Sequence, residues 1–183
     1  HLAVRNGAGI FDVTHMGVFD FKGDGAAMFL NTVTTNDVPG LKVGDSHYTY
    51  LLDVDGIPLD DLMIYRLADD HFLAVVNASN NDKNWAWLSA VKGRSVMIDP
   101  DHPYRTIEGA DRVEMRDLRD PQHGQDCRVD IALQGQESLN ILLKLSASEE
   151  DEAKLKALKW AGVTQVKLRG YDLIISRTGY TGE

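Results

Sequence analysis

The alternation of hydrophobic and polar positions along the first part of the chain predicts a group of short strands. Residues 9–13, 17–21, 48–52, 60–67 and 71–78 form alternating or wholly apolar runs of strand length. The last three runs are joined by connections that are too short for the crossover that a parallel pair requires. These three strands are therefore expected to be antiparallel neighbours in one sheet.

Two helices are predicted among these strands. Asp24 can cap a short helix that runs through Leu30, because a carboxylate at this position can accept hydrogen bonds from the free N–H groups of the first turn. Ser79 is expected to cap a longer helix over residues 80–92 in the same way, and Gly93 is expected to end it.

After Pro100 the chain is charged and irregular as far as Gln125, with an expected edge strand near residues 112–118. The elements expected after this segment are a strand over residues 127–133, helices over 137–145 and 149–160, and strands over 164–168 and 171–176. Ser148 is expected to cap the second of these helices, and Gly162 to end it.

The resulting fold class is α+β, with largely antiparallel or mixed sheets and helices packed on one face. We expect residues 1–98 to form the first half of one module, residues 99–126 an irregular insertion, and residues 127–183 the second half.

Composition narrows the classes of partner and compartment. The formal net charge of -9 repels phosphate backbones, so nucleic acid is an unfavourable partner. No apolar run approaches the ~20 residues that a membrane-spanning helix needs. The single cysteine, Cys127, allows neither an internal disulfide nor a cysteine-rich metal site, which fits a reducing, cytoplasmic compartment. The chain starts at His1 rather than Met, so a removed targeting segment is compatible with the sequence.

Familiar chemical motifs are mostly incomplete in this chain. The Gly7-Ala8-Gly9 segment lacks the third glycine of a dinucleotide-binding loop and precedes a strand instead of following one. The Asp53-Val54-Asp55-Gly56 segment has its glycine two positions too early for a calcium loop and is better explained as a hairpin turn. No pair of histidines has the i, i+4 spacing of helical zinc ligands, so no metal site is expected.

The adjacent carboxylates Asp60 and Asp61 are the most informative polar pair. Successive residues of a strand face opposite sides, so these two cannot share a proton as a catalytic dyad. Asp61 shares its face with Met63 and Tyr65, which together could form the floor of a site for a flat heterocyclic ligand. On the pattern alone, a solvated pair at the start of a strand is the simpler interpretation.

Several blocks of the chain resemble one enzyme family, and they follow that family's order. These blocks are His1-Leu2-Ala3-Val4-Arg5, Gly9-Ile10-Phe11-Asp12-Val13-Thr14-His15-Met16-Gly17, Thr35-Asn36-Asp37-Val38, Tyr48-Thr49-Tyr50-Leu51-Leu52, Asp60-Asp61-Leu62, Val75-Val76-Asn77-Ala78, Leu133-Gln134-Gly135 and Ser176-Arg177-Thr178-Gly179-Tyr180-Thr181-Gly182-Glu183. Together they closely resemble the folate-binding part of the aminomethyltransferase (T-protein) of the glycine cleavage system. Members of that family are considerably longer, so the resemblance implies that this chain is truncated and that further folate contacts lie beyond Glu183.

The resemblance implies a specific reaction of one-carbon metabolism and glycine catabolism. In the family, a lipoyl carrier (H) protein presents an aminomethyl group, ammonia leaves, and the methylene carbon passes to the co-substrate tetrahydrofolate. Asp61 matches the carboxylate that faces the pterin and the reacting nitrogen. The positions that match folate-contacting residues are Met16, Tyr48, Tyr65, Asn77, Arg177 and Tyr180. For Arg177 and Tyr180, support of the loop is as good an interpretation as contact with the ligand.

Two other functions compete with this one. A folate-dependent demethylase, or the folate module of a sarcosine- or dimethylglycine-type enzyme, would share the fold. A folate-binding protein without catalytic activity would usually lack the Asp60-Asp61 pair and much of the opening block, both of which are present here.

Overall fold

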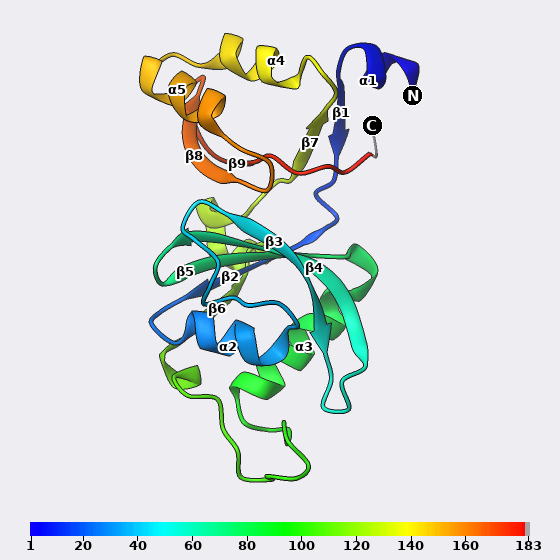
Figure 1. The fold of residues 1–183 in the computed structure, drawn as a ribbon, viewed down its shortest axis with the longest axis vertical. Helices are drawn as coiled ribbons and strands as arrows, with labels where there is room; N and C mark the ends of the chain where they lie inside the picture. Colours follow the sequence, from blue (N-terminus) through cyan, green and yellow to red (C-terminus); the bar gives the residue numbers. More distant parts are fainter. Residues whose placement is uncertain (182–183) are drawn as a thin grey trace. The chain divides into compact units, whose positions relative to one another are not determined.

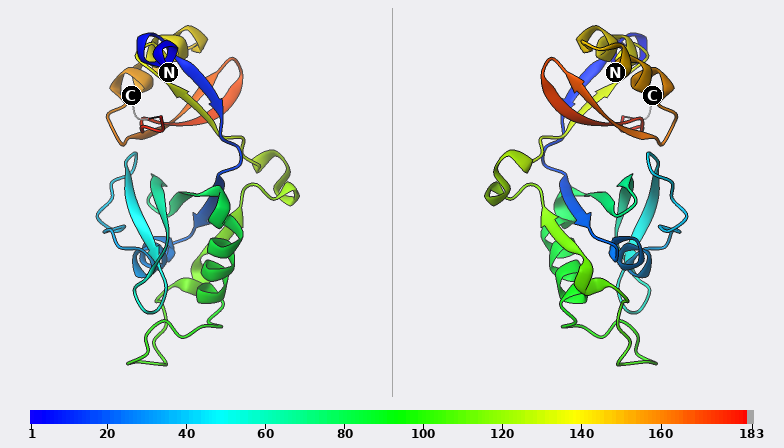
Figure 2. Two further views of the ribbon diagram at one scale, coloured as in Figure 1. Left: turned by 90° about the vertical axis from the view of Figure 1, so that its right-hand side faces the viewer. Right: turned by 90° about the vertical axis from the view of Figure 1, so that its left-hand side faces the viewer.

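The computed structural model describes residues 1–181, so Gly182 and Glu183 of the terminal block lie outside the described residues. The chain divides into two compact units (Figures 1 and 2). The central unit comprises residues 15–128, and the terminal unit combines residues 1–14 with the chain from residue 129 onward. The terminal unit thus joins the beginning and the end of the chain, a division that the expected order of segments does not contain.

The central unit is built on a five-stranded sheet in which every neighbouring pair is antiparallel. Its strands in spatial order are β3 (Ser46–Leu52), β4 (Pro58–Ala68), β5 (His71–Val76), β2 (Gly17–Lys22) and β6 (Glu114–Asp117). The three successive strands β3, β4 and β5 are neighbours, as their short connections predicted, and β6 is the expected edge strand. Asp53 closes the predicted turn between β3 and β4, because its Oδ1 accepts hydrogen bonds from the N–H groups of Asp55 (3.0 Å) and Ile57 (2.8 Å).

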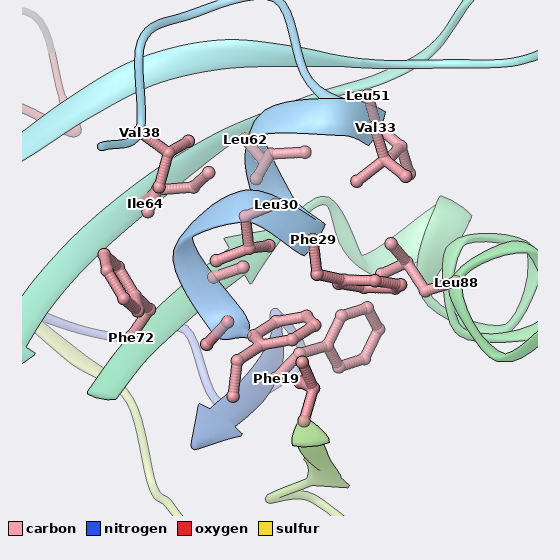
Figure 3. Close-up of a cluster of buried hydrophobic side chains, with 14 of the residues drawn as sticks. Phe19, Phe29, Leu30, Val33, Val38, Leu51, Leu62, Ile64, Phe72 and Leu88 are labelled. Carbon is pink, nitrogen blue, oxygen red and sulfur yellow. The ribbon is translucent and has the colours of Figure 1, made fainter. Parts of the chain in front are cut away.

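One face of this sheet packs against the helices α2 (Ala26–Val33) and α3 (Asn81–Lys92). Figure 3 shows the contact, in which Leu30 and Leu88 of the two helices and Phe19, Leu62 and Ile64 of the sheet belong to one cluster. These five side chains are at most 5% exposed. Because full burial of such a side chain contributes about 1.5–3 kcal/mol, this cluster is the main source of stability in the unit.

Both predicted caps of these helices are wrong, although the helices themselves are confirmed. Gly25 occupies the N-cap position of α2, and Asp24 instead accepts a hydrogen bond from Nε of Arg112 at 2.7 Å. Ser79 lies inside a 3₁₀ turn (Ala78–Asn80) that precedes α3, so the helix begins two residues after it. Gly93 is the C-cap of α3, as predicted.

The segment between α3 and the end of the central unit is mostly irregular. It contains two 3₁₀ turns, Ala110–Arg112 and Pro121–Asp126, which flank β6. Cys127, which follows the second turn, is a half-buried free cysteine whose thiol donates to the carbonyl oxygen of Asp120 at 3.0 Å.

The described part of the terminal unit, which ends at Thr181, contains two small antiparallel sheets and three helices. The first sheet pairs β1 (Gly9–Asp12) with β7 (Ile131–Gln134), and the second pairs β8 (Val163–Leu168) with β9 (Tyr171–Ser176). The helices are α1 (Leu2–Asn6), α4 (Ser138–Leu145) and α5 (Glu149–Ala157). Leu155 of α5 packs with Val166 and Leu168 of β8 to form the buried centre of this unit.

Two boundaries in this unit differ from the prediction. The strand expected from residue 127 begins only at Ile131, because the backbone N–H of Arg128 still donates to the carbonyl oxygen of Leu118 in the central unit. Helix α5 ends at Ala157 rather than at Trp160, so Gly162 is not its stop, and a turn with a positive φ of 59° at Ala161 leads into β8. The cap at Ser148 is confirmed, since its side chain accepts a hydrogen bond from the N–H of Asp151 at 3.0 Å.

Candidate functional site

Asp61 lies near one end of β4, in a row with three other notable side chains. Tyr50 of β3 is its direct partner across the antiparallel pair. On the other side, the pairing of β4 with β5 reaches Leu62–Val76 and that of β5 with β2 reaches Gly17–Val76, and Asn77 and Met16 are the next residues just beyond these strand ends. Because directly opposed residues of a sheet share a face, the row brings together segments that are far apart in the sequence.

Tyrosines extend this row along the sheet. Tyr48 and Tyr65 share the face of Asp61, because residues two apart on a strand point to the same side. The rings of Tyr48 and Tyr50 meet edge to face, with centroids 5.4 Å apart and planes at 81°. Tyr48 and Tyr50 are 49% and 43% exposed, whereas Tyr65 is only 9% exposed, so two open rings and one buried ring lie on the face.

The phenol of Tyr48 is a proton donor at any physiological pH. Hydrogen bonding to Tyr50 raises its pKa well above the usual range, and partial burial and a hydrogen bond to Asp61 act in the same direction. A phenol that stays protonated can donate to the neighbouring carboxylate, which holds the charge of Asp61 in place.

Asp60 points to the opposite face and is buried, at 6% exposure. Its carboxylate accepts four hydrogen bonds, all from neutral groups: the backbone N–H of Asn77 (3.2 Å) and the side-chain amides of Asn77 (2.8 Å), Asn80 (2.7 Å) and Asn84 (2.6 Å). The expectation that the two aspartates face opposite sides is thus visible in their surroundings, because Asp61 is exposed and Asp60 is enclosed.

Asn77 connects the two carboxylates. Its Nδ2 donates to Oδ1 of Asp60 at 2.8 Å, to Oδ1 of Asp61 at 2.9 Å and to the carbonyl oxygen of Asp61 at 3.0 Å. With its nitrogen used in this way, the amide has only its oxygen left for another molecule.

The other two predicted contacts, Arg177 and Tyr180, belong to the terminal unit. Arg177 donates from Nη1 to the carbonyl oxygen of Leu158 at 3.0 Å, and the backbone N–H of Tyr180 donates to Oε1 of Gln134 at 3.3 Å. The Arg177 contact ties β9 to the end of α5, which is how a residue that supports its own loop would behave. The ring of Tyr180 is 51% exposed.

A cavity of about 220 Å³ lies in the central unit but away from this row. It is formed by residues 91–110, with Val91, Val96 and Ile107 among its walls, and none of the predicted site residues lines it. Asp61 itself lies on an open part of its sheet face.

Sequence reasoning missed the residues that support the row. Asn80 and Asn84 were not singled out, although Asn80 caps α3 and Asn84 lies four residues further on. With Asn77, which precedes the 3₁₀ turn before α3, they bring three amides onto one carboxylate. Tyr50 was also missed, although its i, i+2 relation to Tyr48 on a strand indicates a shared face. Gly17 is a third such residue, because Asn81 and Val76 pack so close to its Cα that a side chain would collide with them.

The described part of the chain offers little to other kinds of site. Within residues 1–181, no group of three or more His, Cys, Asp or Glu side chains is arranged to hold a metal ion. None of the helices described is both long enough and apolar enough to cross a membrane. The row therefore suits a neutral or cationic organic ligand with an N–H donor and a flat ring, since it presents carboxylate and amide oxygens beside exposed aromatic rings.

Comparison with known proteins gives a consistent result. The model of the family described as "GCVT N-terminal domain" matches residues 1–183. An aminomethyltransferase from Thermoanaerobacter pseudethanolicus is 37% identical over 183 residues, and one from Chlorobium chlorochromatii is 40% identical over the same length. Both matches include 100% of this chain but only 43% of the relative's length, so the chain spans less than half of these proteins.

A solved structure supports the fold. The crystal structure of the glycine cleavage system aminomethyltransferase T from Bartonella henselae matches with a TM-score of 0.73 and 28% sequence identity. The match covers 100% of this chain and 41% of that one. The expected α+β fold and the resemblance noted from the sequence blocks are both confirmed.

Proposed function

Because this chain belongs to the family of GCVT N-terminal domains, we propose that it forms the tetrahydrofolate-binding part of an aminomethyltransferase of glycine cleavage. In the proposed reaction, a lipoyl carrier (H) protein delivers an aminomethyl group on sulfur. The methylene carbon becomes bonded to two nitrogens of tetrahydrofolate while its bonds to the amine and to the sulfur break, and the two displaced protons leave on ammonia and on the lipoyl thiol. Relatives named aminomethyltransferase favour this activity over the folate-dependent demethylase and the sarcosine- or dimethylglycine-type module. A cytoplasmic location, with no membrane or nucleic acid as partner, completes the proposal.

The observation that carries the proposal is the fixed, exposed carboxylate of Asp61. It is held by Nδ2 of Asn77 at 2.9 Å, and its residue is paired with Tyr50 across β3 and β4. The transfer develops positive charge on the methylene carbon while the attacking amine must keep its lone pair free. A carboxylate that is already oriented can accept a hydrogen bond from the amine and stabilise that charge. One such charge pair at ~4 Å is worth roughly 4 kcal/mol at an effective dielectric constant near 20, before the cost of desolvation.

The neighbouring side chains have complementary tasks in this proposal. The exposed rings of Tyr48 and Tyr50 offer flat apolar surface for a pterin, and Oδ1 of Asn77 can accept a hydrogen bond from one of its N–H groups. Met16 directly precedes β2, one residue beyond the Gly17–Val76 pair, and its flexible side chain can adapt to the outline of a ligand. Arg177 and Tyr180 stay candidates for ligand contact or for support of their loop.

The test is the substitution Asp61→Asn in the protein expressed from its complete reading frame. It keeps the shape of the side chain and removes the charge, so we expect kcat for methylene-tetrahydrofolate formation to fall by about 10²- to 10⁴-fold, with an unchanged circular dichroism spectrum. The matched control is Asp55→Asn, the same change at an exposed position of the turn between β3 and β4. Normal turnover by the Asp61→Asn protein would remove Asp61 from the mechanism.

A further inference from the structure

We propose that Asp60 is a positioning residue for this site, because its buried carboxylate holds the Asn77 amide that in turn fixes Asp61. The inference rests on the proposed function, since it assigns a role in the same site. It is nevertheless testable apart from that function, because the link between Asp60 and Asn77 has a readout of its own.

The environment of Asp60 is unusual for a carboxylate. The carboxylate is 6% exposed, and its four hydrogen-bond donors are all neutral amides. Burial of a charge without a cationic partner is costly compared with burial of a neutral polar group. A position with only a structural task could be filled at lower cost by a neutral side chain. The charge at Asp60 is therefore best explained by what it imposes on its donors.

The Asn77 amide has one favoured orientation. Nδ2 of Asn77 has three oxygens within 3.0 Å, one from Asp60 and two from Asp61. A flipped amide would place the Asn77 oxygen against these same three oxygens, which is strongly unfavourable. Asp60 also accepts the backbone N–H of Asn77, so the main chain and the side chain of this residue are held by one group.

The fixed Asn77 amide in turn restrains Asp61. Oδ1 of Asp61 is fixed by an amide that cannot rotate, although the Asp61 side chain itself is exposed. An exposed carboxylate would otherwise sample several rotamers, and each unproductive rotamer lowers the fraction of the enzyme that is ready to react. Asp60 thus acts on the reaction through Asn77, and it also leaves Oδ1 of Asn77 as a fixed acceptor for an N–H group of the ligand.

The main experiment compares Asp60→Asn with Asp20→Asn in the complete protein. Asp20 is a matched control because it is also a buried aspartate of the central sheet, 2% exposed, but its partners are His71 and Arg116 rather than Asn77. We expect both variants to lose thermal stability. Only Asp60→Asn should lower kcat, by about 10- to 100-fold, with a change in the KM for tetrahydrofolate that is several times smaller.

A double variant tests whether the effect passes through Asn77. If Asp60 acts by holding this amide, Asp60→Asn should cost little further activity in a protein that already carries Asn77→Ala. A full additional loss of kcat in the double variant would overturn the inference. So would a normal kcat for Asp60→Asn, or equal losses of kcat in Asp60→Asn and Asp20→Asn.

A second measurement needs no activity. In protein labelled with ¹⁵N-asparagine, the side-chain NH₂ signals of Asn77 should be shifted and protected from exchange with water, and Asp60→Asn should abolish this protection. Asn140 provides an exposed reference amide in the other unit. Protection that persists in Asp60→Asn would overturn the inference even if Asp61→Asn proves inactive. Activity retained in Asp61→Asn would instead contradict the proposed function and leave the Asp60–Asn77 link standing.

Discussion

Gly17 lies in β2 where the start of α3 presses on the sheet, and the substitution Gly17→Ala tests that packing. A Cβ at this position would lie 2.5 Å from Cγ2 of Val76 and would collide with Oδ1 of Asn81. Both neighbours are enclosed, with Val76 1% and Asn81 2% exposed, so neither can move into open space. The added methyl group must displace the first turn of α3.

The expected cost follows from that displacement. One extra carbon in a well-packed core typically costs 1–3 kcal/mol, and this site belongs in the upper part of that range because two immobile neighbours are affected. Asn81 would also have to give up its contacts through Nδ2 with Asp82 (3.2 Å) and Asp117 (3.4 Å). We therefore expect the free energy of unfolding of the central unit to fall by about 2–3 kcal/mol.

The assay is urea unfolding followed by tryptophan fluorescence. Trp85 and Trp87 report on α3, and a Trp160→Phe background removes the signal from the terminal unit. The control is Gly179→Ala, measured in protein that retains Trp160. The atom nearest to a Cβ at this position is the end of the exposed Trp160 side chain, at 3.3 Å. A midpoint for Gly17→Ala that equals that of the parent protein would show that the contact between β2 and α3 is not tight.

Two further predictions concern the stability of each unit. Burial raises the pKa of Asp20, but hydrogen bonds from His71 (2.6 Å) and Arg116 outweigh this effect and hold the pKa below the ordinary value of 3.8. The ionised Asp20 side chain therefore stabilises the fold above pH 3.8, and this contribution is lost as the pH falls further. Thermal melts across this pH range should show the loss, and the pH dependence should be weaker in Asp20→Asn. In the terminal unit, Ser148→Ala removes the acceptor for the N–H of Asp151 and should cost about 0.5–2 kcal/mol in chemical unfolding; no change would show that the cap is replaced by water.

The order of strands and helices could be predicted from the sequence because it depends on local pattern. The strands around Asp61 follow from alternation and short connections, and α3 follows from its apolar positions and Gly93. The caps at Asp24 and Ser79 could not be predicted, because a distant partner decides the first and an additional turn before the helix decides the second. Arg112, far along the chain, takes the carboxylate of Asp24, and the 3₁₀ turn before α3 moves Ser79 out of the cap position. The pairing of β1 with β7 depends on a contact between the two ends of the chain, which no local pattern contains.

The candidate site shows the same division. The face on which Asp61 lies could be derived from the two-residue period of a strand, and the resemblance supplied Tyr48 and Asn77 as its neighbours. The role of Asp60 could not be derived in this way, because a buried carboxylate with neutral partners is an exception to the rule that charges stay in water. It becomes understandable only when the amides that surround it are seen together.

The carboxylate of Asp60 accepts hydrogen bonds from the amides of Asn77, Asn80 and Asn84, and this arrangement also limits where the chain can vary in length. Each residue added to a helix rotates everything after it by about 100°, so a single insertion between positions 80 and 84 would turn the last amide away from Asp60. The irregular stretch that follows α3 carries no such geometric demand. Gains and losses of residues among related proteins should accordingly accumulate after Gly93 and be excluded between Asn77 and Asn84.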